Sequence, residues 1–303
     1  MTPTQLLESV RRIEVRTNRL VNDTMVGAYL SHFKGRGMDF EELREYLPGD
    51  DVRDIDWNVT LRMGRPFIKR FREERELCAV LAVDGSGSAA FGSGDRTKRE
   101  FAAEVAATLA LSAARNGDKV ALLLFSNEVE LFIPARKGRR HILRLVREML
   151  MFTPRQRGTD IPAALTFLNH VQKRRAIVFL ITDFLHGTGA SASASQRDVN
   201  QELGLTNTRH DLVCLHLHDA RESSLPSAGL LTVEDAETGE LVELDSTRAA
   251  VRERYTQSNL ERLNELDRGL IRAGVDTLRF NTHEPFAPKL QRFFEIRRGR
   301  RRG

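Results

Sequence analysis

Four short runs of almost unbroken apolar residues constrain how this chain folds. Runs of this kind are typical of parallel strands that are buried on both faces of a sheet. Segments with helical periodicity separate them, notably residues 96–116 and 139–151. We therefore predict an α/β fold, with a Rossmann-like sheet of mainly parallel strands and helices on both faces. The runs are LCAVLAV (77–83), KVALLLF (119–125), RAIVFLI (175–181) and LVCLHL (212–217).

The chain divides at about residue 77, where the apolar runs begin. Residues 1–76 are predicted to form an N-terminal extension that packs on the main domain and buries Trp57, the only tryptophan. The main domain is expected at 77–296, with an inserted hairpin near 229–244. Residues 297–303 form a basic tail.

Two segments outside the apolar runs carry local signals. The first 25 residues are typical of an amphipathic helix. The small residues at 187–195 predict a loop, followed by a short helix at 197–205. The face of the N-terminal helix consists of Leu6, Leu7, Val10, Ile13 and Thr17.

The charge balance argues against a broadly basic protein surface. The chain carries 47 Lys and Arg against 42 Asp and Glu, which gives a net charge of +5. Its last seven residues, RRGRRRG, hold five arginines, so the excess belongs to the tail. We expect the tail to be solvated, and nucleic acid to bind, if at all, only through it.

The apolar segments are too short for a membrane protein. No apolar run reaches the roughly 18 residues that span a bilayer, and the charged N-terminal segment differs from a signal peptide. The sequence therefore predicts a cytoplasmic protein without a membrane span. Cys78 and Cys214 lie inside apolar runs without CxxC spacing, so both are predicted to be core residues.

The first apolar run ends in one carboxylate and two hydroxyls. The motif is D-x-S-x-S, and its alternate side chains Asp84, Ser86 and Ser88 share one side of an extended segment. Such hard oxygen ligands suit Mg²⁺ or Mn²⁺, but three are too few. Thr159 precedes a predicted helix, and Asp183 follows the third run. Because parallel strands share one carboxyl edge, we expect these residues to meet there.

This combination resembles the von Willebrand factor A (vWA) domain and its metal-ion-dependent adhesion site (MIDAS). That family uses D-x-S-x-S after the first strand, a threonine in a later loop and an aspartate after the fourth strand. The upstream segment GRGMDFEELREYLPGDDVRDIDWNVTLR (35–62) is similar to the signature of the DUF58 family. In that family the segment precedes an A-type domain. The resemblance covers roughly residues 27 to 245.

The resemblance implies a function based on binding. Ser86, Ser88 and Thr159 would contact the metal ion, while Asp84 and Asp183 would act directly or through water. An acidic side chain of a partner would complete the coordination sphere. The implied function is a Mg²⁺- or Mn²⁺-dependent protein-binding or adaptor module without a small-molecule substrate. Its implied partner is a MoxR-type AAA+ ATPase or a client protein of that ATPase.

Other interpretations of these residues remain open. Asp84 alone is compatible with capping a turn, or with a metal-dependent hydrolase or phosphotransfer enzyme that uses this carboxylate. Ser86 lacks the G-x-S-x-G context of a hydrolase nucleophile, and the chain has no GxxxxGK[ST] motif. The acidic cluster at 50–58 lacks the Gly and Glu that a calcium loop needs, so we interpret it as a turn with ion pairs.

Overall fold

The computed structural model describes residues 11–17, 20–21, 38–73, 77–185, 192–236 and 239–299. A six-stranded sheet of order β10-β7-β6-β3-β4-β5 forms the centre of the fold. Its strands are parallel except β5, which pairs antiparallel with β4. The predicted α/β class is confirmed. The strands are β3 (Cys78–Asp84), β4 (Lys119–Phe125), β5 (Val129–Arg136), β6 (Ile177–Thr182), β7 (Asp211–His218) and β10 (Asp276–Asn281).

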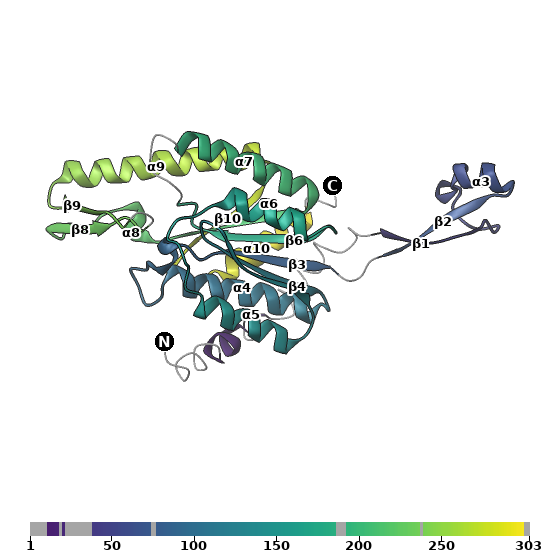
Figure 1. The fold of residues 1–303 in the computed structure, drawn as a ribbon, viewed down its shortest axis with the longest axis horizontal. Coiled ribbons are helices and arrows are strands. Elements are labelled where there is room, and N and C mark those ends of the chain that lie inside the picture. Colours follow the sequence, from purple (N-terminus) through teal and green to yellow (C-terminus); the bar gives the residue numbers. More distant parts are fainter. Residues whose placement is uncertain are drawn as a thin grey trace.

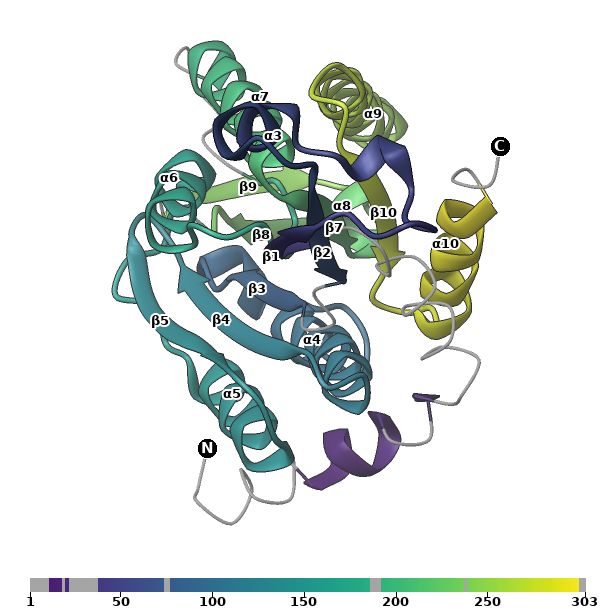
Figure 2. The same ribbon diagram turned by 90° about the vertical axis from the view of Figure 1, so that its right-hand side faces the viewer.

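Helices cover both faces of this sheet, as Figure 2 shows. Side chains of β3 alternate between the two apolar cores, with Leu81 in the first and Ala82 in the second. This alternation explains why the strands are apolar on both faces. The first core is covered by α4 (Lys98–Arg115), α5 (Arg139–Met151) and α10 (Ala287–Gly299); the second is covered by α6 (Ile161–Val171), α7 (Ala192–Arg209) and α9 (Ala249–Arg272).

The segment after β7 forms the predicted hairpin. Helix α8 (Ala220–Ser223) leads to strands β8 (Leu230–Glu234) and β9 (Leu241–Asp245), which pair antiparallel. Upstream, α7 already begins at Ala192, so the loop predicted at 187–195 is wrong for its last residues. The reason is that Ala and Ser are compatible with a helix when the following turns pack on the sheet. Residues 186–191 lie outside the described residues.

Residues 38–73 of the N-terminal extension stand apart from the main domain in Figure 1, so the predicted packing on the main domain is wrong for this part. It contains β1 (Met38–Glu45), the 3-10 helix η1 (Val52–Asp54), α3 (Trp57–Met63) and β2 (Phe67–Glu73), and the two strands form a sheet of their own. Trp57 is 62% exposed, so its predicted burial is wrong. A two-stranded sheet with a seven-residue helix is too small to enclose an indole.

The acidic cluster of this extension forms local contacts. Asp50 pairs with Arg44 through both of its carboxylate oxygens, at 2.7 and 2.9 Å. Asp56 caps α3 by accepting from the backbone N–H of Asn58 and pairs with Lys69 at 2.8 Å. The predicted turn with ion pairs is confirmed for these residues.

The two ends of the chain contribute to the folded body. Residues 11–17 are helical and bury Ile13 and Thr17, as predicted for that face. Leu6, Leu7 and Val10 lie outside the described residues.

Arg297 is buried at the end of α10 and pairs with Asp211 and Asp276 at 2.8 and 2.7 Å. It therefore belongs to the main domain, and the predicted tail boundary at 297 is too early. Residues 300–303 lie outside the described residues.

The cysteines and the hydropathy agree with the sequence analysis where the structure describes them. Cys214 is fully buried and Cys78 is partly buried, and neither forms a disulfide. Burial raises the pKa of Cys78 to about 11, which leaves little reactive thiolate at neutral pH.

Among the described residues, no helix combines the length and the apolar character that crossing a membrane demands.

Candidate functional site

The strand order creates a crevice at the carboxyl edge of the sheet. From β3 the chain continues to β4 on one side, whereas from β6 it continues to β7 on the other side. Open α/β sheets bind ligands at such a point, where the direction of winding changes. Asp84 ends β3 and Asp183 directly follows β6. The hydroxyl of Thr182 donates to Asp84 Oδ2 at 2.6 Å, which joins the two strand ends.

The DGSGS loop after β3 is held by its own aspartate. Asp84 Oδ1 accepts a hydrogen bond from the backbone N–H of Ser86 at 2.9 Å. The hydroxyl oxygens of Ser86 and Ser88 lie 3.0 Å apart, and both residues are buried. The structure therefore brings three of the five predicted residues together within one short loop.

The loop that carries Thr159 lies against the DGSGS loop. The N–H of Gly87 donates to the carbonyl of Arg157 at 2.8 Å, and the N–H of Asp160 donates to the carbonyl of Ser126 at 2.8 Å. Thr159 Oγ1 is buried and has no hydrogen-bond partner among the described residues. Buried hydroxyls are almost always hydrogen-bonded, so this oxygen is available to bind a water molecule or an ion.

A buried lysine that the sequence analysis did not identify lies beside Asp183. Lys98 is 1% exposed, and its Nζ is 2.5 Å from Asp183 Oδ2 and also contacts Glu222. It is the first residue of α4, directly after the cap Thr97. A cation is unfavourable at a helix N-terminus, so the two carboxylates must stabilise it there.

The three charged groups Asp183, Asp84 and Lys98 differ in the direction in which the protein shifts their pKa values and in its causes. Burial would raise the pKa of Asp183, but Lys98 lowers it below its ordinary value, so Asp183 stays ionised. Burial raises the pKa of Asp84, and the neighbouring charge of Asp183 raises it further. Burial would lower the pKa of Lys98, but Asp183 and Glu222 raise it, so the ammonium stays charged. Asp84 is thus the carboxylate most in need of a second cation.

The backbone after Asp183 is strained. Phe184 has a φ of +53°, a left-handed conformation that bulky residues rarely adopt. Its N–H donates to Thr182 Oγ1 at 3.1 Å, while the N–H of Leu185 donates to Asp183 Oδ1 at 3.0 Å. Strain of this kind costs about 1–3 kcal/mol and concentrates at functional sites. Here it fixes the carboxylate of Asp183 at the crevice.

The donor set fits a hard divalent cation with little protein charge. Ser86, Ser88 and Thr159 offer three neutral hydroxyl oxygens, which suit Mg²⁺ or Mn²⁺. Both oxygens of Asp84 and both of Asp183 already accept hydrogen bonds from the protein. Within the described ranges, no group of three or more His, Cys, Asp and Glu residues is arranged to hold a metal. A cation here would therefore depend on the hydroxyls.

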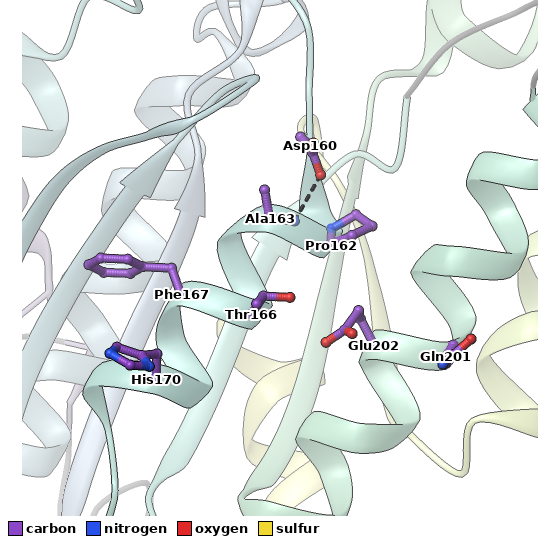
Figure 3. A pocket seen from close by; sticks show the side chains of 8 residues that line it. All are labelled: Asp160, Pro162, Ala163, Thr166, Phe167, His170, Gln201 and Glu202. Carbon is purple, nitrogen blue, oxygen red and sulfur yellow. Dashed lines mark hydrogen bonds between the residues drawn. The ribbon is translucent and has the colours of Figure 1, made fainter.

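Two cavities lie near these loops. One has a volume of about 620 Å³ and extends from Ser88 toward α8 and the β8–β9 hairpin. The other, of about 680 Å³, is an open groove between α6 and α7. Figure 3 shows that Asp160, at the end of this second groove, turns toward the N–H of Ala163, to which it is hydrogen-bonded at 2.8 Å. Asp160 thus caps α6, and the second groove lies apart from the DGSGS loop.

Comparison with known protein families shows to which family the chain belongs. Residues 42–265, more than half of the sequence, match the family model described as "Protein of unknown function DUF58". The chain belongs to the DUF58 family. This confirms the membership predicted from the segment at 35–62. The association with a MoxR-type ATPase stays a prediction.

Relatives of this DUF58 protein occur in mycobacteria. Uncharacterised proteins of Mycobacterium bovis and Mycobacterium tuberculosis are each 28% identical to it over 297 residues. Each match covers 97% of this chain and 90% of the relative. A protein of Mycobacterium avium is 27% identical over 170 residues, which is 55% of this chain and 94% of that relative.

Solved structures similar to this DUF58 protein include a VWA domain and a conserved hypothetical protein. The conserved hypothetical protein BatB of Bacteroides thetaiotaomicron has a TM-score of 0.46 and 14% identity, covering 73% of this chain and 98% of BatB. The VWA domain of SpRpn10 has a TM-score of 0.37 and 9% identity, covering 71% and 93%.

Proposed function

We propose that this DUF58 protein is a metal-dependent protein-binding module. Mg²⁺ or Mn²⁺ would be held by the hydroxyls of Ser86, Ser88 and Thr159, with Asp84 and Asp183 acting directly or through water. The observation that carries the proposal is that Thr159 Oγ1 is buried and has no hydrogen-bond partner among the residues that the structure describes. Its loop is tied to the DGSGS loop through Gly87 and Arg157.

The residues of the site have different roles in binding. When bound, the cation supplies an electrophilic position for a carboxylate of the partner. Asp84 orients the DGSGS loop through Ser86 and fixes Thr182. Lys98 neutralises Asp183, which leaves the cation short of protein charge. The partner's carboxylate supplies that charge, so metal and partner are expected to bind together.

A binding role agrees better with the geometry than a nucleophilic role for Asp84. The Asp84 side chain is buried, and both of its oxygens accept hydrogen bonds from within the protein. A nucleophilic carboxylate needs an oxygen that faces the substrate. We therefore propose capture of a partner and not hydrolysis or phosphoryl transfer.

The first test is a titration with Mn²⁺ that is monitored by electron paramagnetic resonance. It is done with and without acetate, which substitutes for the partner's carboxylate. We expect saturable binding by the wild type, strengthened by acetate. Thr159→Val should weaken it about tenfold or more, because one ligand oxygen is lost while the volume is kept. Thr166→Val is the matched control on the exposed side of α6 and should bind as the wild type does. Equal Mn²⁺ affinities of all three proteins would contradict the proposal.

The second test concerns the partner, for which we propose a MoxR-type AAA+ ATPase or its client, on the resemblance described above. Purified ATPase is passed over the immobilised DUF58 protein with Mg²⁺ and then with a chelator. We expect retention only with Mg²⁺, and a loss of retention with Thr159→Val. Retention that is the same with Mg²⁺ and with the chelator would contradict metal-dependent binding of this partner.

A further inference from the structure

The solvent-facing side of α5 carries a row of arginines. Figure 2 shows α5 at one edge of the helix layer that covers the first core, so this side of the helix is open. Its exposed positions are all arginine up to the last residue, Met151, which is 57% exposed. The exposed arginines are Arg139, Arg140, Arg144 and Arg147.

The helical repeat places most of this row on one line. Residues that are separated by four, three and four positions share one side of a helix. We call the set with this spacing the α5 stripe. Each residue adds 1.5 Å along the helix axis, so the stripe is about 16 Å long. It consists of Arg140, Arg144, Arg147 and Met151.

Folding alone does not explain these arginines. Like charges four positions apart destabilise a helix, and Arg140 and Arg144 are such a pair. Arg139 and Arg140 also lie in the first turn of α5, where the helix dipole favours acidic residues, and that turn contains none. A mixture of acidic and basic residues would therefore stabilise α5 better, which points to a contact outside the chain.

Two of the four exposed arginines are neutralised locally. Arg147 pairs with the adjacent Glu148 at 2.8 Å, and both side chains remain partly accessible to solvent. Arg139 pairs with Glu14 of the N-terminal helical segment. These two ion pairs leave the middle of the row without a local counter-charge.

Arg140 and Arg144 form no ion pair with any residue that the structure describes. The neighbouring helix α4 does not supply one. Of its two acidic residues, Glu100 belongs to the capping box of α4, and Glu104 pairs with two other arginines. The uncompensated charge on this side of α5 is therefore positive, so the stripe is complementary to acidic groups.

The stripe leads to the candidate metal site. Met151 ends α5, and the next residue, Phe152, packs on the DGSGS loop. A Cβ on Gly85 would lie 2.1 Å from Cε1 of the Phe152 ring. A partner that contacts the DGSGS loop can therefore extend along α5.

We propose that the α5 stripe binds an acidic helix of a partner protein. Carboxylates of this helix pair with Arg140 and Arg144, and an apolar side chain packs on Met151. Because both helices rise 1.5 Å per residue, an equal spacing keeps each carboxylate beside its arginine. Arginine binds a carboxylate through two parallel hydrogen bonds, which makes the contact depend on position. This contact rests on the stripe alone; that the same partner also reaches the metal site rests on the proposed function.

The small extent of the stripe favours a protein over a nucleic acid. Specific protein–DNA interfaces bury about 1,000 Å² or more of protein surface and are strongly positive. Here two unpaired guanidiniums lie between neutralised ones, and the row ends in an exposed apolar side chain. Few phosphates would be neutralised, whereas a helix with a few carboxylates and an apolar residue matches the row.

The test measures the binding of three fluorescently labelled probes to the full chain by anisotropy. The first is an alanine-rich helical peptide with three Glu separated by four and three residues and a Leu four residues further on. The second has the same composition in scrambled order, with its helix content matched by circular dichroism. The third is an oligothymidylate of similar length. We expect the spaced peptide to bind about fivefold or more tightly than the scrambled peptide. Equal binding of the two peptides, or tighter binding of the oligothymidylate, would overturn the proposal.

Variants of two exposed arginines locate the contact. Arg144 lies in the middle of the stripe, whereas Arg268 is exposed on α9, over the other core. Arg144→Gln should weaken the spaced peptide about fivefold, and Arg268→Gln should change its affinity by less than about twofold. Arg144→Gln also removes the repulsion from Arg140, so its melting temperature should not fall, which excludes misfolding as the cause. Equal effects of the two substitutions on binding would overturn the proposal.

A chelator separates this proposal from the proposed function. The spaced peptide should bind equally well with Mg²⁺ and with chelator, because its ion pairs do not involve the cation. If the peptide binds in this way but Mn²⁺ does not bind to the chain, the proposed function fails while the α5 proposal stands. If Mn²⁺ binds but the spaced peptide does not, the α5 proposal fails while the metal site stands.

Discussion

Lys98 gives the candidate site a positive charge of its own. Its ammonium lies between Asp183 and Glu222, and the three groups are largely shielded from water. Two carboxylates in such a place are costly unless a cation compensates them. A divalent ion that approaches Asp183 is repelled by Lys98. The lysine therefore stabilises the fold and at the same time weakens the affinity for metal.

Replacing Lys98 should lower the stability of the fold and raise the affinity for metal. In Lys98→Met the repulsion is absent, and we expect Mn²⁺ to bind about tenfold more tightly. Without metal the variant should unfold at a lower temperature, because two buried carboxylates lose their partner. Lys98→Arg keeps the charge and is the control for affinity. Weaker Mn²⁺ binding by a folded Lys98→Met would contradict this role.

Gly87 allows the hairpin tip to approach the DGSGS loop. In Gly87→Ala the new Cβ would lie 2.3 Å from the carbonyl oxygen of Ala236, so backbone must move. We expect a loss of about 1–3 kcal/mol in the free energy of unfolding, measured with urea. Gly204→Ala on α7 is the control, since its Cβ would meet only a carbonyl oxygen at 4.0 Å. A gain of up to about 1 kcal/mol is expected there, and equal effects of both substitutions would contradict the argument.

The residues of the site were predictable to different degrees from the sequence. Asp84, Ser86 and Ser88 occur in one short motif, and Asp183 directly follows a recognisable strand, so their positions in the sequence predict that they lie at one edge of the sheet. Lys98 was not predictable, because its burial depends on Glu222, which lies 124 positions away. The available signal is weak: a lysine at the first position of a helix, where acidic residues are preferred.

At the scale of elements, strands that are apolar on both faces were the easiest to predict. Each of β3, β4, β6 and β7 carries its own signal, because burial on both faces removes any alternation. The strands of the N-terminal extension were missed, since MDFEELRE and FIKRFRE mix charged and apolar residues without a regular alternation. They are strands because they pair with each other.

Asp219 joins three elements beyond the candidate site. It precedes α8 and accepts hydrogen bonds from Ser93, Arg221 and Thr282. Burial alone would raise the pKa of Asp219, but these hydrogen bonds outweigh it and lower the pKa to about 2. The unfolded chain has a value of about 4. The carboxylate therefore stabilises the fold fully above about pH 4, and this contribution disappears as the pH falls toward 2.

Asp219→Asn should remove this acid dependence. We expect a loss of about 1.5–3 kcal/mol in unfolding free energy at neutral pH, because hydrogen bonds to a charged acceptor are replaced. Between about pH 4 and pH 2 the stability of the variant should fall less steeply than that of the wild type. Denaturant unfolding at a series of pH values measures both. If the unfolding free energy of the variant falls as steeply with pH as that of the wild type, other carboxylates cause the loss of stability in acid.

At the scale of the whole molecule, the exposed N-terminal extension supplies its own probe. Trp57 is the only tryptophan and is 62% exposed on α3. Its emission should resemble that of N-acetyl-tryptophanamide, and acrylamide should quench it readily. Leu61→Ser, at a position that is 81% exposed, should change stability by no more than about 0.5 kcal/mol. A blue-shifted, protected emission would mean that α3 is covered.

The contacts of the candidate site join residues that lie far apart in the sequence, and this determines when the site can form during synthesis. The hydrogen bond between Thr182 and Asp84 joins residues 98 positions apart, and Lys98 reaches across 124 positions to Glu222. During synthesis, a ribosome must therefore release the chain beyond residue 222 before the last charge is in place. A partner that recognises the complete site is therefore expected not to bind nascent or truncated chains that end before Glu222.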